Sequence, residues 1–343
     1  MKAAVLHKIG EPLRVEDVPV PQVGPDAVLV ETRTCGLCRT DVHIQDGLAY
    51  VPELPHIPGH EPAGVIAGMG KEVSGLKIGQ RVAVYLFDTC GQCYFCRMGR
   101  DAQCTQLHGL LGVTRNGGFA EYFVTPAKNV FPLPDTVPFE IGGLTSCAVI
   151  TAVHAFRRSR LGPNDTAVVL GSGGVAQPLI QILAAAGVRV VAVSRSEAKL
   201  DLARRLGARL ALRVDQPDVA KTVQQFAGEW MSAGVQCAFD CVGLSSTMKE
   251  AASYLMRGGQ LIVVGEEPEF PEIDTIQIAQ RELEIIGSRN GSRQDFLDSL
   301  SMLAAGIISP PISREYPLEE INEALEFLRS GRAAARIIVR IRE

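Results

Sequence analysis

The sequence predicts an α/β protein in which a doubly wound parallel sheet follows a β-rich domain. Short β-type runs with Gly and Pro punctuation fill roughly the first 145 residues, and from about Cys147 apolar strands alternate with helix-length segments. Strands that alternate with crossover helices are typical of a parallel sheet covered by helices. We expect one domain to comprise residues 1–148 with 291–343, and the other residues 149–290.

The individual elements can be placed from apolar runs and turn residues. The β-rich part contains candidate strands at 2–7, 13–21, 27–34, 63–68, 81–87 and 119–125. The parallel sheet is expected from runs at 166–170, 188–193, 210–214, 235–240, 260–265 and 283–287, with helices such as 176–187 and 196–207 between them. Two helices are expected at 295–306 and 318–331, and the last apolar run, 335–341, is expected to return to the first domain because no crossover helix leads into it.

Composition narrows the class of protein. The chain has 343 residues, of which 46% are apolar and 21% charged, and this globular composition excludes a disordered or fibrous chain. The net charge of −4 without a Lys/Arg run argues against nucleic-acid partners and a polybasic membrane anchor. Neither a signal-peptide core nor an 18-residue apolar stretch occurs. We therefore expect a cytoplasmic protein with small-molecule partners and no membrane partner.

Four of the nine cysteines are clustered in the pattern Cys90-x2-Cys93-x2-Cys96-x7-Cys104. A disulfide framework is typical of small secreted domains, whereas this chain is long and its cysteine total is odd. Four thiolates make a closed tetrahedral zinc site with a structural role. An iron–sulfur cluster is the alternative. Zinc is favoured because nothing else in the chain indicates electron transfer.

A second, sparser set consists of Cys38, the pair His60-Glu61, and Cys147. Each is weak alone, since an isolated Cys or His is more often a packed core residue than a ligand. Together, two Cys and one His fit a catalytic zinc site that keeps a fourth position for water or substrate.

A glycine-rich turn, Gly171-Ser172-Gly173-Gly174-Val175-Ala176, lies between the run 166–170 and a helix-length segment. In this context the motif predicts a dinucleotide site, with the pyrophosphate at the N-terminus of the helix. Gly171 permits the turn, Gly173 lets the backbone approach the pyrophosphate, and Ala176 is small enough for helix–strand packing.

The segments CGLCRTDVH, PGHEPAG, NGGFAEY and GSGGVA, together with the four-cysteine segment, resemble in order and spacing the zinc-dependent medium-chain alcohol dehydrogenases. The resemblance covers essentially the whole chain. It implies a Rossmann cofactor domain, a GroES-like catalytic domain, and one catalytic and one structural zinc ion. It further implies hydride transfer between an alcohol, or its aldehyde or ketone, and a nicotinamide cofactor, in a homodimer or homotetramer.

The resemblance also implies roles for single residues. Cys38, His60 and Cys147 match the catalytic zinc ligands, and Glu61 matches a carboxylate that can approach the metal. Asp41 matches the carboxylate that orients the zinc-ligating histidine. Thr40 matches the hydroxyl that takes the alcohol proton, and His43 the histidine that relays it. Four further matches are cofactor contacts: Arg39 and Arg336 at the pyrophosphate, and Val175 and Thr151 at the nicotinamide. For the two arginines the alternative is a solvated surface charge.

The substrate class is narrowed by Cys147, because polyol-type relatives carry Glu at that position. A simple alcohol or aldehyde is therefore favoured. The alternatives are a specialised polyol, amino-acid-derived or aromatic-alcohol dehydrogenase of the same superfamily, and a catalytically silent NAD(P)H-binding protein. Loss of a catalytic zinc ligand would favour the silent protein, and all three ligands are present.

Cofactor choice is predicted from the end of the run 188–193, where an NAD site usually carries Asp or Glu. The residues there are Ser194, Arg195 and Ser196. A hydroxyl beside a guanidinium can bind a 2′-phosphate through charge-assisted hydrogen bonds, so NADP(H) is favoured. NAD(H) stays possible, since Arg195 could stack on the adenine and Glu197 could serve the ribose.

Overall fold

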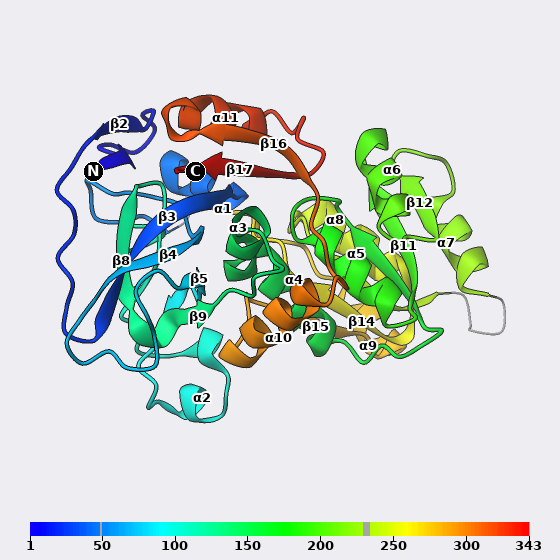
Figure 1. Ribbon diagram of the computed structural model, residues 1–343. Helices are drawn as coiled ribbons and strands as arrows, with labels where there is room; N and C mark the ends of the chain where they lie inside the picture. The colour runs from blue at the N-terminus through cyan, green and yellow to red at the C-terminus, as the bar shows by residue number, and fades with distance from the viewer. Residues whose placement is uncertain (49, 229–233, 343) are drawn as a thin grey trace. The chain divides into compact units, whose positions relative to one another are not determined.

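The computed structural model of the protein describes residues 1–48, 50–228 and 234–342. The chain divides into two compact units: unit 1 is Met1–Ile150 with Gly291–Glu343, and unit 2 is Thr151–Asn290 (Figure 1). The chain thus passes from unit 1 to unit 2 and back again, and unit 1 is assembled from two segments far apart in the sequence.

Unit 2 contains a six-stranded sheet with the order β12-β11-β10-β13-β14-β15, in which every neighbouring pair is parallel. The order reverses between β10 and β13, which is where doubly wound sheets bind ligands at the carboxyl ends of the strands. The predicted parallel sheet is confirmed, and each of the six apolar runs contributes a strand. The strands are β10 (Thr166–Leu170), β11 (Arg189–Ser194), β12 (Leu210–Arg213), β13 (Val235–Asp240), β14 (Leu255–Val263) and β15 (Glu284–Gly287).

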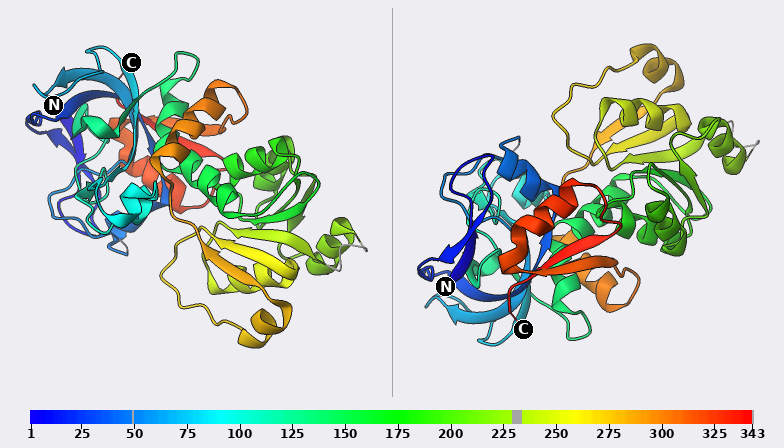
Figure 2. Two further views of the ribbon diagram at one scale, coloured as in Figure 1. Left: turned by 90° about the horizontal axis from the view of Figure 1, so that it is seen from below. Right: turned by 90° about the horizontal axis from the view of Figure 1, so that it is seen from above.

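Helices connect these strands and pack beside the sheet (Figures 1 and 2). All five residues of β10 are buried, as expected for a parallel strand covered on both faces. The helices are α5 (Ala176–Ala185), α6 (Glu197–Arg205), α7 (Val219–Ala227), α8 (Ser245–Tyr254) and α9 (Thr275–Arg281). Helix α4 (Ala148–Arg158) begins in unit 1, and the chain passes into unit 2 within its first turn.

Unit 1 is built on a mostly antiparallel sheet in which β16, β17, β3, β4, β5 and β9 are neighbours in that order, and β8 also pairs with β3. Strand β17 pairs with β3, so the tail returns to the first domain as predicted (Figure 1). The strands are β3 (Ala27–Leu37), β4 (Glu61–Met69), β5 (Arg81–Val84), β8 (Tyr122–Pro126), β9 (Val130–Pro132), β16 (Ile312–Pro317) and β17 (Arg336–Arg340). Two further pairs are β1 (Lys2–Val5) with β2 (Arg14–Asp17), and β6 (Phe87–Asp88) with β7 (Gly109–Leu110).

Short helices complete unit 1, and α11 packs against α1. They are α1 (Arg39–Asp46), α2 (Tyr94–Arg97), α3 (Phe139–Gly142), α10 (Arg293–Ala304) and α11 (Ile321–Arg329), with 3-10 turns η1 (Asp101–Gln103), η2 (Ala127–Asn129), η3 (Gly143–Ser146) and η5 (Leu318–Glu320). The segment 89–108 between β6 and β7, called the cysteine lobe below, carries α2, η1 and the four clustered cysteines.

Within the described ranges, no helix taken singly has the length and apolar character needed to cross a membrane. One bent pair of helices, Phe139–Ser146 with Ala148–Arg158, is long and apolar enough for a membrane span when the two are counted together, and only length and composition support that. Its apolar residues include Leu144, Val149 and Ile150, which are fully buried in the core.

Candidate metal centres and cofactor site

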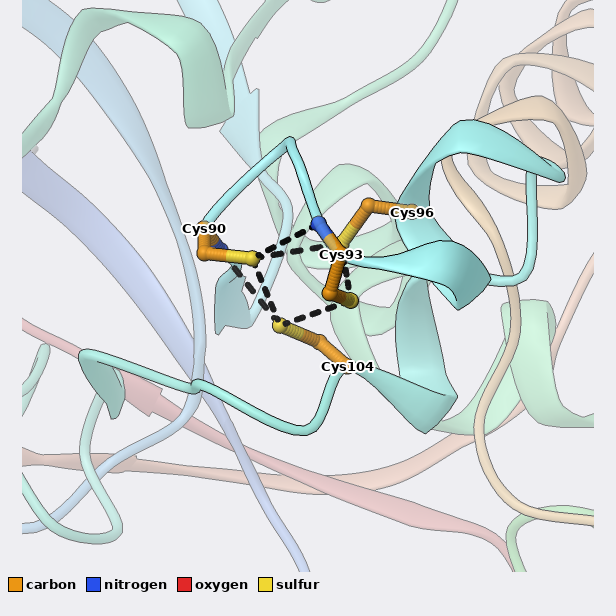
Figure 3. A group of neighbouring side chains, drawn as sticks. All are labelled: Cys90, Cys93, Cys96 and Cys104. Carbon is orange, nitrogen blue, oxygen red and sulfur yellow. Dashed lines mark hydrogen bonds between the residues drawn. The ribbon is translucent and has the colours of Figure 1, made fainter.

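The four side chains of the cysteine lobe point toward one another (Figure 3). The Sγ of Cys104 lies 3.5 Å from that of Cys90 and 3.9 Å from that of Cys93, and the Sγ of Cys96 lies 4.0 Å and 3.5 Å from the same two atoms. Four sulfurs placed tetrahedrally at about 2.3 Å from a zinc ion would be about 3.8 Å apart. The lobe therefore fits a closed four-sulfur zinc site.

Backbone N–H groups favour thiolates in this lobe. The N–H of Cys93 donates to the Sγ of Cys90 at 3.3 Å, and the N–H groups of Cys90 and Gln106 donate to the Sγ of Cys104, each at 3.4 Å. Backbone hydrogen bonds from Cys96 and Thr105 lower the pKa of Cys93 to about 6. Because metal ions bind thiolates rather than thiols, the loop is prepared for a cation.

The second predicted set also comes together. Cys38, His60, Glu61 and Cys147 each offer one ligand atom, and these atoms lie within 4.8 Å of one another. Antiparallel pairing of β3 with β4 puts Gly36 opposite Glu61 and so brings the segment of Cys38 to that of His60. A Cβ at Gly36 would overlap the Glu61 carboxylate, so only glycine leaves room for this side chain.

Asp41 fixes the geometry of two of these residues. One carboxylate oxygen accepts from the backbone N–H of Cys38 at 2.8 Å, where α1 begins, and the other lies 3.2 Å from Nδ1 of His60. This contact keeps the proton on Nδ1, while Nε2 of His60 is buried and has no hydrogen-bond partner among the residues that the structure describes. A buried nitrogen lone pair beside two sulfurs fits a zinc ligand, because leaving it unpaired costs free energy.

The charges of the cluster also match a dication. A hydrogen bond with Cys147 lowers the pKa of the Cys38 thiol, and the same bond together with burial raises the pKa of Cys147. Burial raises the pKa of Glu61 to about 7, against the opposing charge of Arg336. Burial disfavours protonated His60, but the charge and hydrogen bond of Asp41 raise its pKa well above the usual value. A bound cation would displace the protons that these groups retain.

In unit 2, the turn between β10 and α5 has the shape expected of a phosphate-binding loop. Gly171 has φ +87°, and a Cβ there would lie 2.9 Å from the Val242 side chain. A Cβ at Gly173 would meet nothing within 4 Å, so this part of the turn is open to a ligand. Gly174 and Val175 lead into α5, whose N-terminus carries the positive end of the helix dipole. In its first turn the N–H of Gln177 already donates to the Gly173 carbonyl at 3.2 Å, and Pro178 has no N–H.

Comparison with known proteins places the chain in a family. Residues 24–135 match the alcohol dehydrogenase GroES-like domain, and residues 174–305 match the zinc-binding dehydrogenase domain. An alcohol dehydrogenase of Geobacillus stearothermophilus is 33% identical over 343 residues, covering 99% of this chain and 100% of the relative. The chain belongs to the zinc-dependent medium-chain alcohol dehydrogenase family.

Other members of this family support the assignment. An NAD-dependent alcohol dehydrogenase of Sulfolobus acidocaldarius is 32% identical over 352 residues, covering 99% of this chain and 100% of that protein. The structure of the alcohol dehydrogenase of Aeropyrum pernix has a TM-score of 0.92 and 32% identity, and covers 99% of this chain and 100% of that one. The predicted family, fold and enzyme class, an oxidoreductase acting on alcohols, are confirmed.

Arg336 is only 6% exposed, and its guanidinium donates to the Glu61 carboxylate through Nη2. The surface-charge alternative is therefore wrong for Arg336. The pyrophosphate contact stays a prediction, because a guanidinium has five N–H donors and can hold a carboxylate and a phosphate together. Arg39, by contrast, is exposed, and its Nε donates to Nε2 of His43 at 3.3 Å.

The residues matched to the proton relay of alcohol dehydrogenases lie on α1. The Cys38 thiol donates to Thr40 Oγ1 at 3.8 Å, which puts this hydroxyl next to the candidate metal centre. His43 follows less than one helical turn later and is buried. Thr151 is buried in α4, in unit 2.

Two cationic residues of the Ser194–Arg195 region, Lys199 and Arg213, were not predicted from the sequence. The hydroxyl of Ser172 donates to that of Ser194 at 2.7 Å. Burial and the neighbouring Arg195 lower the pKa of Lys199, and Arg213 lies opposite Ser194 in the pairing of β11 with β12. The spacing of four residues between Arg195 and Lys199 was a usable signal. The sequence held no comparable signal for Arg213, because its place opposite Ser194 depends on strand register, which is a tertiary property.

Proposed function

We propose that this chain catalyses hydride transfer between a simple alcohol and a nicotinamide cofactor, with residues 1–148 and 291–343 as the catalytic domain and 149–290 as the cofactor domain. The observation that carries the proposal is the meeting of Cys38, His60 and Cys147, with the buried Nε2 of His60 lacking a hydrogen-bond partner within the described part of the chain. When bound there, a zinc ion acts as a Lewis acid that lowers the pKa of the alcohol hydroxyl. The four-sulfur site takes a second zinc ion that stabilises the lobe.

The surrounding residues have separate tasks in this proposal. Asp41 holds His60 in the tautomer that presents Nε2. The Thr40 hydroxyl accepts the proton that leaves the substrate, and His43 passes it on, so that the buried site need not admit bulk water. Glu61 and Arg336 form a buried ion pair beside Cys38 and Cys147 in which each charge compensates the other, and the dication compensates the two thiolates.

We further propose a preference for NADP(H) over NAD(H). Ser194 ends β11 without a carboxylate, Arg195 follows it directly, and Lys199 is close enough to Arg195 for that charge to lower its pKa. Arg213 lies opposite Ser194 in the strand pairing, but its guanidinium is paired with the Asp215 carboxylate at 2.5 Å. The carboxylate that could serve an NAD ribose, Glu197, is paired with Arg204 at 3.1 Å. A hydroxyl with the cations Arg195 and Lys199 beside it favours a 2′-phosphate over a bare ribose.

Cofactor preference is tested by comparing kcat/KM for the two cofactors in the wild type and in Ser194→Asp. We expect the wild type to prefer NADP(H), and the aspartate to reverse that preference by repelling the 2′-phosphate. Arg195→Ala is expected to weaken the use of NADP(H) more than that of NAD(H). A wild type that prefers NAD(H), as the named Sulfolobus relative does by its description, would overturn the assignment.

The substrate is tested with a panel of simple, polyol and aromatic alcohols, followed by the absorbance of the reduced nicotinamide. Simple alcohols are expected to give the highest kcat/KM, because Cys147 occupies the position of the polyol-type Glu. Cys38→Ser is expected to be inactive with every alcohol. If the zinc-loaded wild type turned over none of them while still binding the reduced cofactor, the silent binding protein would be the better interpretation.

We also infer a homodimer or homotetramer. Strand β15 is an edge of the parallel sheet, and its Ile285 is 41% exposed. Phe270 is fully exposed nearby in the sequence, as are large parts of Ile273 and Ile276. Unpaired strand edges and clustered exposed apolar residues favour association. Light scattering of the purified protein tests this, with Phe270→Ser and Ile276→Ser expected to weaken the assembly.

A further inference from the structure

The two points at which the chain leaves and re-enters unit 1, Ile150 and Gly291, lie in contact within that unit. The chain leaves unit 1 after Ile150 and returns to it at Gly291. A Cβ added to Gly291 would lie 2.7 Å from Cγ1 of Ile150 and 3.0 Å from Cβ of Asp295, distances too short for ordinary packing. The Gly291 backbone therefore lies directly against the Ile150 side chain. Because the two are in close contact, a shift of the chain at one residue must displace the other.

Buried contacts hold this meeting point in place. The hydroxyl of Tyr85, a fully buried residue, donates to the Gly291 carbonyl at 2.8 Å. The Tyr85 ring packs edge-to-face on Phe296 of α10, with 5.9 Å between the ring centroids. Ser292 begins α10, and its backbone N–H donates to the Asp295 carboxylate at 2.8 Å. The returning chain is thus fixed at its carbonyl and at the helix cap.

Arg293 ties the same segment to the cysteine lobe. Its backbone N–H donates to the carboxylate of Asp101 at 3.1 Å, and its Nε lies 3.8 Å from the other oxygen of that carboxylate. The guanidinium also donates to the Lys128 carbonyl at 2.5 Å and to the Asn129 side chain at 2.8 Å, and lies 4.9 Å from the centroid of the Tyr85 ring. Asp101 belongs to η1, between the ligands Cys96 and Cys104, and is buried.

We propose that Arg293 is a positioning residue through which Asp101 of the cysteine lobe holds the Ile150–Gly291 meeting point. Cys147 directly precedes α4, and Ile150 and Thr151 share the first turn of this helix. Because a helix turn moves as a rigid element, a shift of Ile150 displaces the metal ligand before it and the cofactor residue after it. The lobe then has a role in the reaction as well as in folding. The inference rests on the proposed function for the roles of Cys147 and Thr151.

The test uses zinc-loaded wild type, Arg293→Met, Asp101→Asn and the double variant. Met keeps the apolar stem of Arg293 without its charge, and Asn keeps the shape of Asp101. The matched control is Arg100→Met, because Arg100 lies in the lobe and its guanidinium also stacks on an aromatic ring, 5.4 Å from the centroid of Phe95. Zinc content, Tm, the Kd of reduced cofactor and kcat/KM are measured for each protein.

We expect Arg293→Met and Asp101→Asn each to raise the cofactor Kd and to lower kcat/KM by roughly three- to thirtyfold while keeping both zinc ions. The double variant should be no worse than Arg293→Met alone, since that change already removes the ion pair with Asp101 together with the contacts to Lys128 and Asn129. Arg100→Met should behave as the wild type. With cobalt in the catalytic site, the sulfur-to-metal absorption band, which reports the placement of Cys147, should shift in both link variants and not in the control.

A purely folding role predicts a different result. Tm and zinc content would fall, but molecules that retain both metal ions would bind cofactor like the wild type and show an unshifted cobalt band. That outcome, or additive effects in the double variant, would overturn the inference. Failure of the proposed function is distinguishable, because a wild type without alcohol turnover would fail in the activity assay whether or not the cobalt band shifts in the variants.

Discussion

Replacement of Asp41 by Asn is a stringent test of how the catalytic metal site is organised, because it changes charge and donor pattern with almost no change of shape. Both partners of the carboxylate are donors: the backbone N–H of Cys38 at 2.8 Å and the Nδ1–H of His60 at 3.2 Å. An Asn side chain has one acceptor oxygen and one amide donor. The amide NH2 of Asn must therefore face one of the two donors, the Cys38 N–H or the His60 Nδ1–H, so that this hydrogen bond is lost unless His60 changes its tautomer.

The magnitude follows from these two possibilities. If the amide faces Cys38, α1 loses its cap at a cost of about 1 kcal/mol. If the amide faces His60, the proton moves to Nε2 and the ligand atom is lost. Changes at a group that orients a metal ligand typically cost about 10–100-fold in metal affinity, or roughly 1.4–2.8 kcal/mol. We expect the zinc affinity of the catalytic site to fall by this factor.

The assay is a competition between the protein and a chromogenic chelator, with the two zinc sites resolved by their affinities. The lobe site serves as an internal reference, since Asp41 does not touch it. Asp46→Asn is the matched control, because it makes the same chemical change in the last turn of α1, where Asp46 pairs with Arg329 at 2.5 Å. Wild-type zinc affinity at the catalytic site of Asp41→Asn would refute the reasoning, as would equal losses in both variants.

Three further predictions concern other parts of unit 1. Cys93→Ser removes a ligand from the lobe and should lower Tm and promote association, whereas Cys38→Ser should abolish turnover with little change in Tm; calorimetry and kcat measured on both variants separate the two effects. His43→Ala should lower kcat and be partly rescued by small external bases such as imidazole, and an unchanged pH–rate profile would place His43 outside the proton path. Burial lowers the pKa of His56 to about 4, so the folded protein binds this proton less readily than the unfolded chain, in which the pKa is near 6.5. The contribution of His56 to the free energy of unfolding should therefore be fully present above a pH of about 6.5. It should be lost as the pH drops toward 4, which lowers the free energy of unfolding by up to about 3 kcal/mol. His56→Gln should flatten this dependence in urea unfolding at a series of pH values, and an unaltered slope would show that another group causes it.

Much of the fold and of the metal chemistry could be predicted because the signals are local. The alternation of apolar strands with helix-length segments lies within windows of about 10–15 residues, and this periodicity predicts the parallel sheet. The four lobe cysteines lie within one loop, so their spacing alone places the sulfurs within reach of one ion. Cys38, His60 and Cys147 are far apart in the chain, and for them the resemblance to a family supplied the connection.

The partners of these residues were decided by the tertiary structure. The contact between Arg336 and Glu61, 275 residues away, was not predicted and contradicts only the surface-charge alternative for this arginine. Arg213 lies opposite Ser194 through the register of β11 with β12, and α6 brings Lys199 close to Arg195. The link between Asp101 and Arg293 spans 192 residues. Spacing in the sequence determines contacts only within one element or loop, whereas contacts between distant segments depend on the register and packing of the whole unit.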